Sequence, residues 1–171
     1  HVAVQLAALA GARVAATVSS PEKARIVLAL GAEEAINYRE TDFAEEVLHW
    51  SGGLNVAFDN AGADVLQKTF RAMAPYGRVV TLMGVPPDDA DLNAYSLNLT
   101  IHNVMMLTPM WKGLETRLRE QAAIIGKMLD LVAAQKLSIR LTESFDLGDA
   151  ASAHAFLESG AAMGKVTLRM N

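Results

Sequence analysis

The chain has 171 residues, of which 51% are hydrophobic and 20% are charged, so it can bury the core of one domain and is too apolar for wholesale disorder. Its net charge of -4 argues against nucleic-acid binding, which needs a basic face, and with 0 Cys this sequence has no disulfide, no Cys-ligated zinc and no thiol nucleophile. No apolar run is long enough to predict a membrane-spanning helix, and the apolar opening lacks the basic start of a signal peptide, so we expect a cytoplasmic protein.

The predicted elements alternate between helices and strands. The chain opens within an amphipathic helix that has no cap before it and ends at Gly11, so we expect the sequence to begin partway through a longer polypeptide. Ser20-Pro21-Glu22 is typical of a helix start, with a Ser cap, Pro at the first position and an acid in the first turn. In chain order the pattern predicts strands at 14–18, 35–38, 56–59, 78–84, 99–108, 139–145 and 165–170, and further helices at 21–30, 41–50, 65–73, 114–137 and 149–159.

This alternation, with connections of a few residues, predicts an α/β fold built on a doubly wound parallel sheet with helices on both faces. Residues 78–84 form an almost continuous apolar run, as expected for a strand that is covered on both faces. A turn is predicted at Pro75-Tyr76-Gly77, and the one long loop at 86–98. Open sheets of this kind bind ligands at the carboxyl ends of their strands, so those ends hold the candidate site residues.

The first strand end carries a sequence suited to a phosphate. In a dinucleotide-binding unit this position meets the adenosine ribose, where an Asp or Glu favours the 2′-hydroxyl of NAD. Here Ser19 and Ser20 leave room in place of the acid, and Lys23 brings a positive charge for the 2′-phosphate of NADP. The alternative is that Ser20 is an ordinary helix cap and Lys23 a solvated side chain.

The later strand ends carry further candidates. Tyr38 and Arg39 follow the next strand, where a phenol can lie beside adenine and a guanidinium adds charge, although exposed Tyr-Arg pairs are also common without a ligand. Asp59-Asn60-Ala61-Gly62 and Gly84-Val85-Pro86 end the two strands after it, and their small residues let a ligand approach the backbone. A tight strand-to-helix turn is the alternative at the first of these two.

The sequence lacks the residue patterns that several enzyme classes need. The 4 His are widely separated and give no metal-ligand spacing, and neither a G-x-S-x-G elbow nor a P-loop occurs. Asn60-Ala61-Gly62 is similar to a motif of the short-chain dehydrogenases, but none of Tyr38, Tyr76 and Tyr95 has a Lys at the fourth position after it, as that family requires. We therefore reject that family, expect no metal ligand in this sequence, and assign no catalytic acid or base.

In order and spacing, the chain resembles the medium-chain dehydrogenase/reductase superfamily and, within it, the zinc-independent quinone oxidoreductase branch. The resemblance covers essentially the whole sequence. Its marks are Val4-Gln5-Leu6-Ala7, residues 12–23, Ala29-Leu30-Gly31-Ala32, Ile36-Asn37-Tyr38-Arg39, Gly77-Arg78-Val79-Val80 and residues 145–166.

The resemblance implies a Rossmann-like dinucleotide-binding domain at residues 1–137, without its first strand and Gly-rich turn. It also implies that residues 138–171 are a strand-helix-strand segment that returns toward a catalytic domain. In the family that domain precedes the first helix and takes roughly 150 residues.

The implied function is hydride transfer from NADPH to a small-molecule substrate, namely a quinone, an enone or a similarly activated carbonyl. The implied cofactor residues are, for the 2′-phosphate, Ser19, Ser20, Lys23, Tyr38 and, as a weaker member, Arg39; along the sheet edge, Asn60, Gly62, Gly84 and Val85; and facing the nicotinamide and substrate, Thr108. Two other functions stay open: a zinc-dependent alcohol dehydrogenase whose metal ligands lie in the other domain, and a non-enzymatic NADPH-binding protein on the same fold.

Residues 99–108 bear on assembly, because they are apolar on both alternating faces and an exposed strand of that composition favours aggregation. The family covers this strand by pairing it with its twin across a two-fold axis, so the resemblance implies a homodimer. Burial of the strand under the long helix that follows is the alternative.

Overall fold

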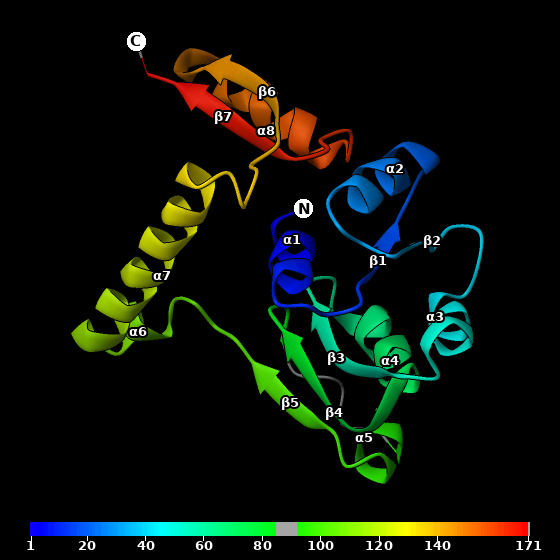
Figure 1. The fold of residues 1–171 in the computed structure, drawn as a ribbon. Coiled ribbons are helices and arrows are strands. Elements are labelled where there is room, and N and C mark those ends of the chain that lie inside the picture. The colour runs from blue at the N-terminus through cyan, green and yellow to red at the C-terminus, as the bar shows by residue number, and fades with distance from the viewer. Residues whose placement is uncertain (85–91, 171) are drawn as a thin grey trace. The chain divides into compact units, whose positions relative to one another are not determined.

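The computed structural model describes residues 1–84 and 92–170 (Figure 1). The chain forms two compact units, His1–Ala35 with Ala122–Asn171, and Ile36–Gln121. The expected boundary between residues 137 and 138 does not coincide with this division, and the assignment of 138–171 to a separate domain stays a prediction. Val85 lies outside the described residues, so its expected place beside the cofactor also stays a prediction.

The first unit begins with three elements of the predicted kind. They are α1 (Val2–Leu9), β1 (Ala15–Val18) and α2 (Pro21–Ala29), and β1 pairs with β2 (Glu34–Asn37). Ser20 caps α2 as predicted, because its side chain accepts a hydrogen bond from the Lys23 amide at 3.3 Å. Pro21 stands within the first turn, where its missing N–H costs nothing.

The same unit ends in the predicted strand-helix-strand. Its elements are β6 (Leu141–Asp146), the 3-10 turn η1 (Leu147–Asp149), α8 (Ala150–Glu158) and β7 (Lys165–Arg169). The two strands are parallel neighbours, and Phe145 of β6 packs on Phe156 of α8 with ring centroids 6.0 Å apart. The prediction of this segment is confirmed, with bounds that differ by one or two residues.

A buried side chain, Gln5, ties α1 to the segment before β6. Its amide nitrogen donates to the carbonyl oxygens of His1 and Ser138 at 2.7 and 2.9 Å. Its amide oxygen accepts from the backbone N–H and the hydroxyl of Ser138 at 2.8 and 3.0 Å. Because the Gln5 side chain is fully bonded, its burial stabilises this junction instead of costing an unpaired polar group.

The second unit is built on a parallel sheet in the order β3-β4-β5. Its elements are α3 (Phe43–Ser51), β3 (Leu54–Asp59), α4 (Ala63–Arg71), β4 (Met73–Thr81), α5 (Leu92–Ser96), β5 (Thr100–Asn103) and α6 (Thr108–Trp111). Leu66 and Phe70 of α4 are almost fully buried against Ala57 and Val79 of the sheet. This cluster fixes α4 on one face and sets the position of the turn that leads into it.

The turn predicted at residues 75–77 lies inside β4 as a bulge. Met73 pairs with Leu54, but the next matched pair is Arg78 with Val56, so the residues between them loop out of the ladder. Tyr76 takes a positive φ of 61° there. The strand predicted at 78–84 is therefore the second part of β4, and it ends at Thr81.

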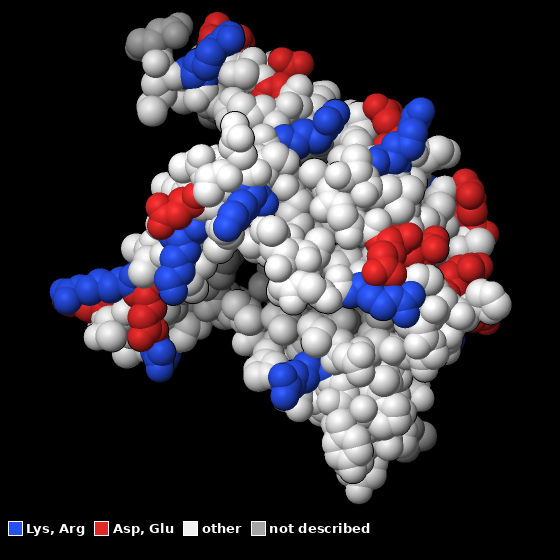
Figure 2. Space-filling model, viewed as in Figure 1, with Lys and Arg blue, Asp and Glu red and all other residues white. Residues whose placement is uncertain are grey.

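The strand predicted at residues 99–108 is shorter than expected. β5 ends at Asn103, and the apolar residues after it leave the sheet and enter α6. The side chains of Met105 and Met106 in this run are 52% and 65% exposed. Burial of the run, under the following helix or in a homodimer, stays a prediction. The following helix is α7 (Glu115–Ala133), and Figure 2 shows basic and acidic side chains interleaved along it, two pairs of which are ion pairs.

Candidate cofactor-binding site

The structure brings Ser19, Ser20 and Lys23 together where β1 ends and α2 begins. The Lys23 ammonium donates to the Ser19 hydroxyl at 3.1 Å and to the Gly160 carbonyl at 3.2 Å. An ammonium has three N–H donors, so one is left for an anion when only residues 1–84 and 92–170 are considered. Ser20 is indeed a helix cap, but Lys23 is held in place and is not a freely solvated side chain.

Tyr38 and Arg39 lie in the turn after β2, within the second unit. Tyr38 is 50% exposed, and the Arg39 amide donates to the Asn37 side chain at 3.2 Å. The Asn37 amide in turn donates to Glu40 at 2.6 Å, so the turn is closed by its own side chains. The grouping of Tyr38 and Arg39 with Lys23 in one site stays a prediction.

The turns after β3 and β4 are joined by a buried polar network that sequence reasoning missed. Asp59 and Thr81 end these two strands and are 4% and 1% exposed. The Thr81 hydroxyl donates to the Asp59 carboxylate at 2.8 Å, and the same carboxylate accepts the Gly62 amide at 3.1 Å. The available signal was Asp59 itself, because a carboxylate just after an apolar strand and before a helix is suited to binding the first amides of that helix.

Position 62 requires glycine, whereas position 84 has room for a side chain. Gly62 has φ 72°, and a Cβ there would lie 2.6 Å from the Met83 Cβ, so a side chain meets both strain and a clash. Gly84 has φ 113°, and within the described part of the chain a Cβ added to it would meet nothing within 4 Å. Asn60 is exposed between the anchored ends of its turn. These residues lie where predicted, at the carboxyl ends of β3 and β4.

The predicted strand at 99–108 would place Thr108 at the end of a sheet strand. In the structure Thr108 does not directly follow a strand, because β5 ends at Asn103. It is the first residue of α6, is exposed, and donates its amide to the Met105 carbonyl at 3.1 Å. The residue that does follow β5 is Val104, whose amide bonds to the Thr81 carbonyl at 3.0 Å. The expected place of Thr108 beside the nicotinamide stays a prediction.

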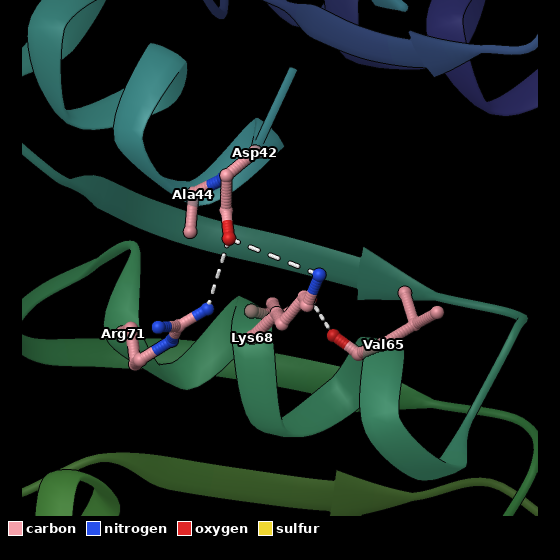
Figure 3. Close-up of polar contacts among 6 residues, drawn as sticks. Asp42, Ala44, Val65, Lys68 and Arg71 are labelled. Atoms are coloured by element: carbon pink, nitrogen blue, oxygen red, sulfur yellow. Dashed lines mark hydrogen bonds and ion pairs between the residues drawn. The ribbon is translucent and has the colours of Figure 1, made fainter. Parts of the chain in front are cut away.

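A charged cluster joins α3 and α4 of the second unit (Figure 3). Asp42 caps α3 by accepting the Ala44 amide at 2.9 Å, and its other oxygen lies 3.3 Å from Arg71 and 3.8 Å from Lys68 on α4. The Ala44 amide is the largest cause that holds the pKa of Asp42 below its ordinary value; Lys68 and Arg71 add to the effect, and partial desolvation opposes it. We interpret this cluster as structural, because both cations contact the one carboxylate that also caps α3.

Two hollows of about 400 and 540 Å³ occur in the first unit, along α2 and the segment 135–140. None of the predicted cofactor residues lines either of them. Within residues 1–84 and 92–170, no three His, Asp or Glu side chains are grouped to hold a metal ion. The helices of these ranges also include none that is long and apolar enough to span a membrane.

A family model described as zinc-binding dehydrogenase matches residues 30–168. The chain belongs to this zinc-binding dehydrogenase family. The resemblance found in the sequence is thereby confirmed at the level of the superfamily.

Relatives of this zinc-binding dehydrogenase chain include reductases of small molecules. A 2-haloacrylate reductase from a Burkholderia species is 31% identical over 98% of the chain and 51% of the relative. Quinone oxidoreductase 1 of Escherichia coli strain K12 is 28% identical over 98% of the chain and 52% of the relative. The chain thus spans about half the length of the curated relatives that it matches.

Solved structures agree with the fold. A zinc-dependent alcohol dehydrogenase, so described provisionally, from Rhizobium etli CFN 42 superposes with a TM-score of 0.86 at 28% identity, over 99% of this chain and 51% of the other. The Escherichia coli quinone oxidoreductase complexed with NADPH superposes with a TM-score of 0.83 at 25% identity, over 99% of this chain and 53% of the other. The expected α/β fold with parallel strands is confirmed.

Proposed function

We propose that the complete protein carrying this chain is an NADPH-dependent oxidoreductase that reduces a quinone, an enone or another activated carbonyl, and that this chain supplies its cofactor-binding half. The observation that carries the proposal is the placement of Ser19, Ser20 and Lys23 at one strand end, with an ammonium donor left over. NADPH, when bound, supplies the hydride. The residues of this chain bind and orient it.

The preference for a 2′-phosphate follows from charge and room. An acidic residue at this strand end would repel a phosphate, and the two Ser side chains leave that position uncharged. Lys23 supplies the positive charge, and its bonds to Ser19 and Gly160 fix the ammonium before the ligand arrives. The NADPH held by the similar Escherichia coli enzyme supports this choice of cofactor.

The remaining residues take the roles that the resemblance implies. Tyr38 and Arg39 lie beside the adenosine end. The turns after β3 and β4 then line the cofactor along the sheet edge, and Thr108 faces the nicotinamide and the substrate. The residues of these two turns are Asn60, Gly62, Gly84 and Val85.

Assembly is part of the same proposal, and so is a cytoplasmic location. β5 has one neighbour, β4, among the strands that the structure describes, and the run after it exposes the side chains of Met105, Met106 and Leu107. A homodimer that pairs the two β5 strands would bury this run.

The test is to purify the complete protein and follow the fluorescence of NADPH and NADH with a panel of quinones, enones and aldehydes. Oxidation of NADPH by one of these classes, with NADH much slower, supports the proposal. Binding of NADPH without oxidation by any of them would instead favour a non-enzymatic role.

A second candidate is a zinc-dependent alcohol dehydrogenase, which the family description and the Rhizobium etli structure favour. Metal analysis of the complete protein separates the two functions. One zinc per chain, whose removal abolishes alcohol oxidation, would establish this candidate in place of the quinone or enone reductase.

A further inference from the structure

The two turns that would line the cofactor along the sheet edge are held by one buried side-chain pair. Asp59 and Thr81 are opposite each other in the register of β3 and β4, and their carboxylate-hydroxyl bond of 2.8 Å is buried. Both are the last residues of their strands. The pair therefore lies where the two strands end and the two turns begin.

From this pair, hydrogen bonds run outward into both turns. On one side the Asp59 carboxylate accepts the amides of Ala61 at 3.2 Å and of Gly62 at 3.1 Å. On the other side the Thr81 hydroxyl oxygen accepts the Met83 amide at 3.2 Å. The backbone of each turn is thus bonded to one member of the pair, and the pair bonds the turns to each other.

The two turns also approach each other closely. Gly62 lies so close to Met83 that a Cβ on it would be 2.6 Å from the Met83 Cβ. Ala63, the first residue of α4, takes φ 45°, which an L residue adopts only under constraint from its surroundings. The surrounding bonds are those of Asp59 to the two preceding amides.

We propose that Asp59 and Thr81 are positioning residues, which hold the turns 59–62 and 81–84 in the arrangement that admits the dinucleotide without touching it. This rests on the proposed function. The pair itself is buried, whereas Asn60, Met83 and Gly84 beside it are exposed and present the bound surface.

The bonds of Asp59 also bear on which part of the ligand these turns accept. Amides at the start of a helix bind phosphate in many proteins, but here Asp59 occupies those of Ala61 and Gly62, so they are not available to a phosphate. NADPH differs from NADH only by the 2′-phosphate, which the proposed function places near Lys23 at another strand end. The pair therefore acts on NADPH and NADH alike.

The experiment compares Thr81→Val with Thr81→Ser in the complete protein. Val keeps the shape of Thr but breaks both hydrogen bonds of the hydroxyl, whereas Ser keeps the hydroxyl. We expect Thr81→Val to raise the Kd of both NADPH and NADH about tenfold and by the same factor, and Thr81→Ser to stay within about twofold of the unmodified protein. A folded Thr81→Val protein with a lower Tm but unchanged Kd values would overturn the proposal, since a purely structural role predicts that outcome.

A second measurement needs no variant and covers the case in which Thr81→Val does not fold. Amide hydrogen exchange at Gly62 and Met83 is measured with and without saturating NADPH. Slow exchange in both states is expected if the pair orders the turns in advance. Fast exchange that becomes slow only with NADPH shows that the ligand orders them and refutes the proposal. Failure of the unmodified protein to bind either nucleotide would refute the proposed function, whatever the exchange rates are.

Discussion

Replacing Lys23 by Ala removes the cation that the structure fixes at the predicted 2′-phosphate position. The loss to the fold is small, because the bonds of the ammonium to Ser19 and Gly160 are at or near the surface. Partly exposed bonds of this kind contribute about 1 kcal/mol or less to the free energy of unfolding. A folded variant is therefore expected.

The loss in binding is larger and selective. A unit charge about 4 Å from a phosphate charge interacts by roughly 1–4 kcal/mol for effective dielectric constants between those of water and a protein surface. We expect the Kd of NADPH to rise about 10- to 100-fold, and that of NADH to change by less than about twofold.

The assay is a fluorescence titration of both nucleotides at several salt concentrations, with Lys127→Ala as the matched control. Lys127 is an exposed Lys on α7 and is not among the predicted site residues. The Kd of NADPH for the unmodified protein should rise with salt more steeply than that of Lys23→Ala, because an ion pair is screened. Equal losses for NADPH and NADH, or a similar loss in the control, would refute the 2′-phosphate assignment.

Three further outcomes are expected. Asp42→Asn should lower the free energy of unfolding by about 0.5–1 kcal/mol at neutral pH. The pKa of Asp42 is lowered in the folded state, so the stability that its charge adds is present above the unfolded-state pKa and is lost as the pH falls through the folded-state value. Urea unfolding should show the gap to the unmodified protein closing in acid, and a gap that widens would contradict this. Gly62→Ala should cost about 1–3 kcal/mol in the same assay, because of its φ of 72° and the nearness of Met83, and an unchanged midpoint would disprove the close contact. Met105→Lys should convert a dimer to a monomer in sedimentation analysis, and an unchanged dimer would exclude the run after β5 from the interface.

Local signals in the sequence were sufficient to predict those features of the structure that depend on residues close together along the chain. Ser20 caps α2, and Asp42, next to the predicted start of a helix, caps α3, because a hydroxyl or carboxylate reaches amides two or three residues ahead. The alternation of strands and helices was sufficient for the fold class for the same reason. Each β-α unit contains its own periodicity and its own turn.

The errors in strand length come from contacts that no local pattern contains. Residues 99–108 are apolar throughout, yet the ladder with β4 ends at Asn103, because β4 itself ends at Thr81. The bulge in β4 likewise depends on which residues of β3 lie opposite it. Hydrophobicity alone predicts that a segment is apolar, whereas the partner strand determines how much of it is paired.

Two hydrogen bonds of the first unit join segments that are far apart in the sequence. Gln5 bonds to Ser138, and Lys23 bonds to Gly160, across 133 and 137 residues of sequence. No sequence motif marks either residue pair. A Gln in an apolar helix and a Lys in the first turn of a helix each have an ordinary local explanation, so neither indicates a distant partner. The bond of Lys23 has a consequence for binding as well. If Lys23 binds the 2′-phosphate as proposed, its side chain loses less rotamer freedom on binding because Ser19 and Gly160 already hold it. The C-terminal segment would then add to nucleotide affinity without contacting the nucleotide.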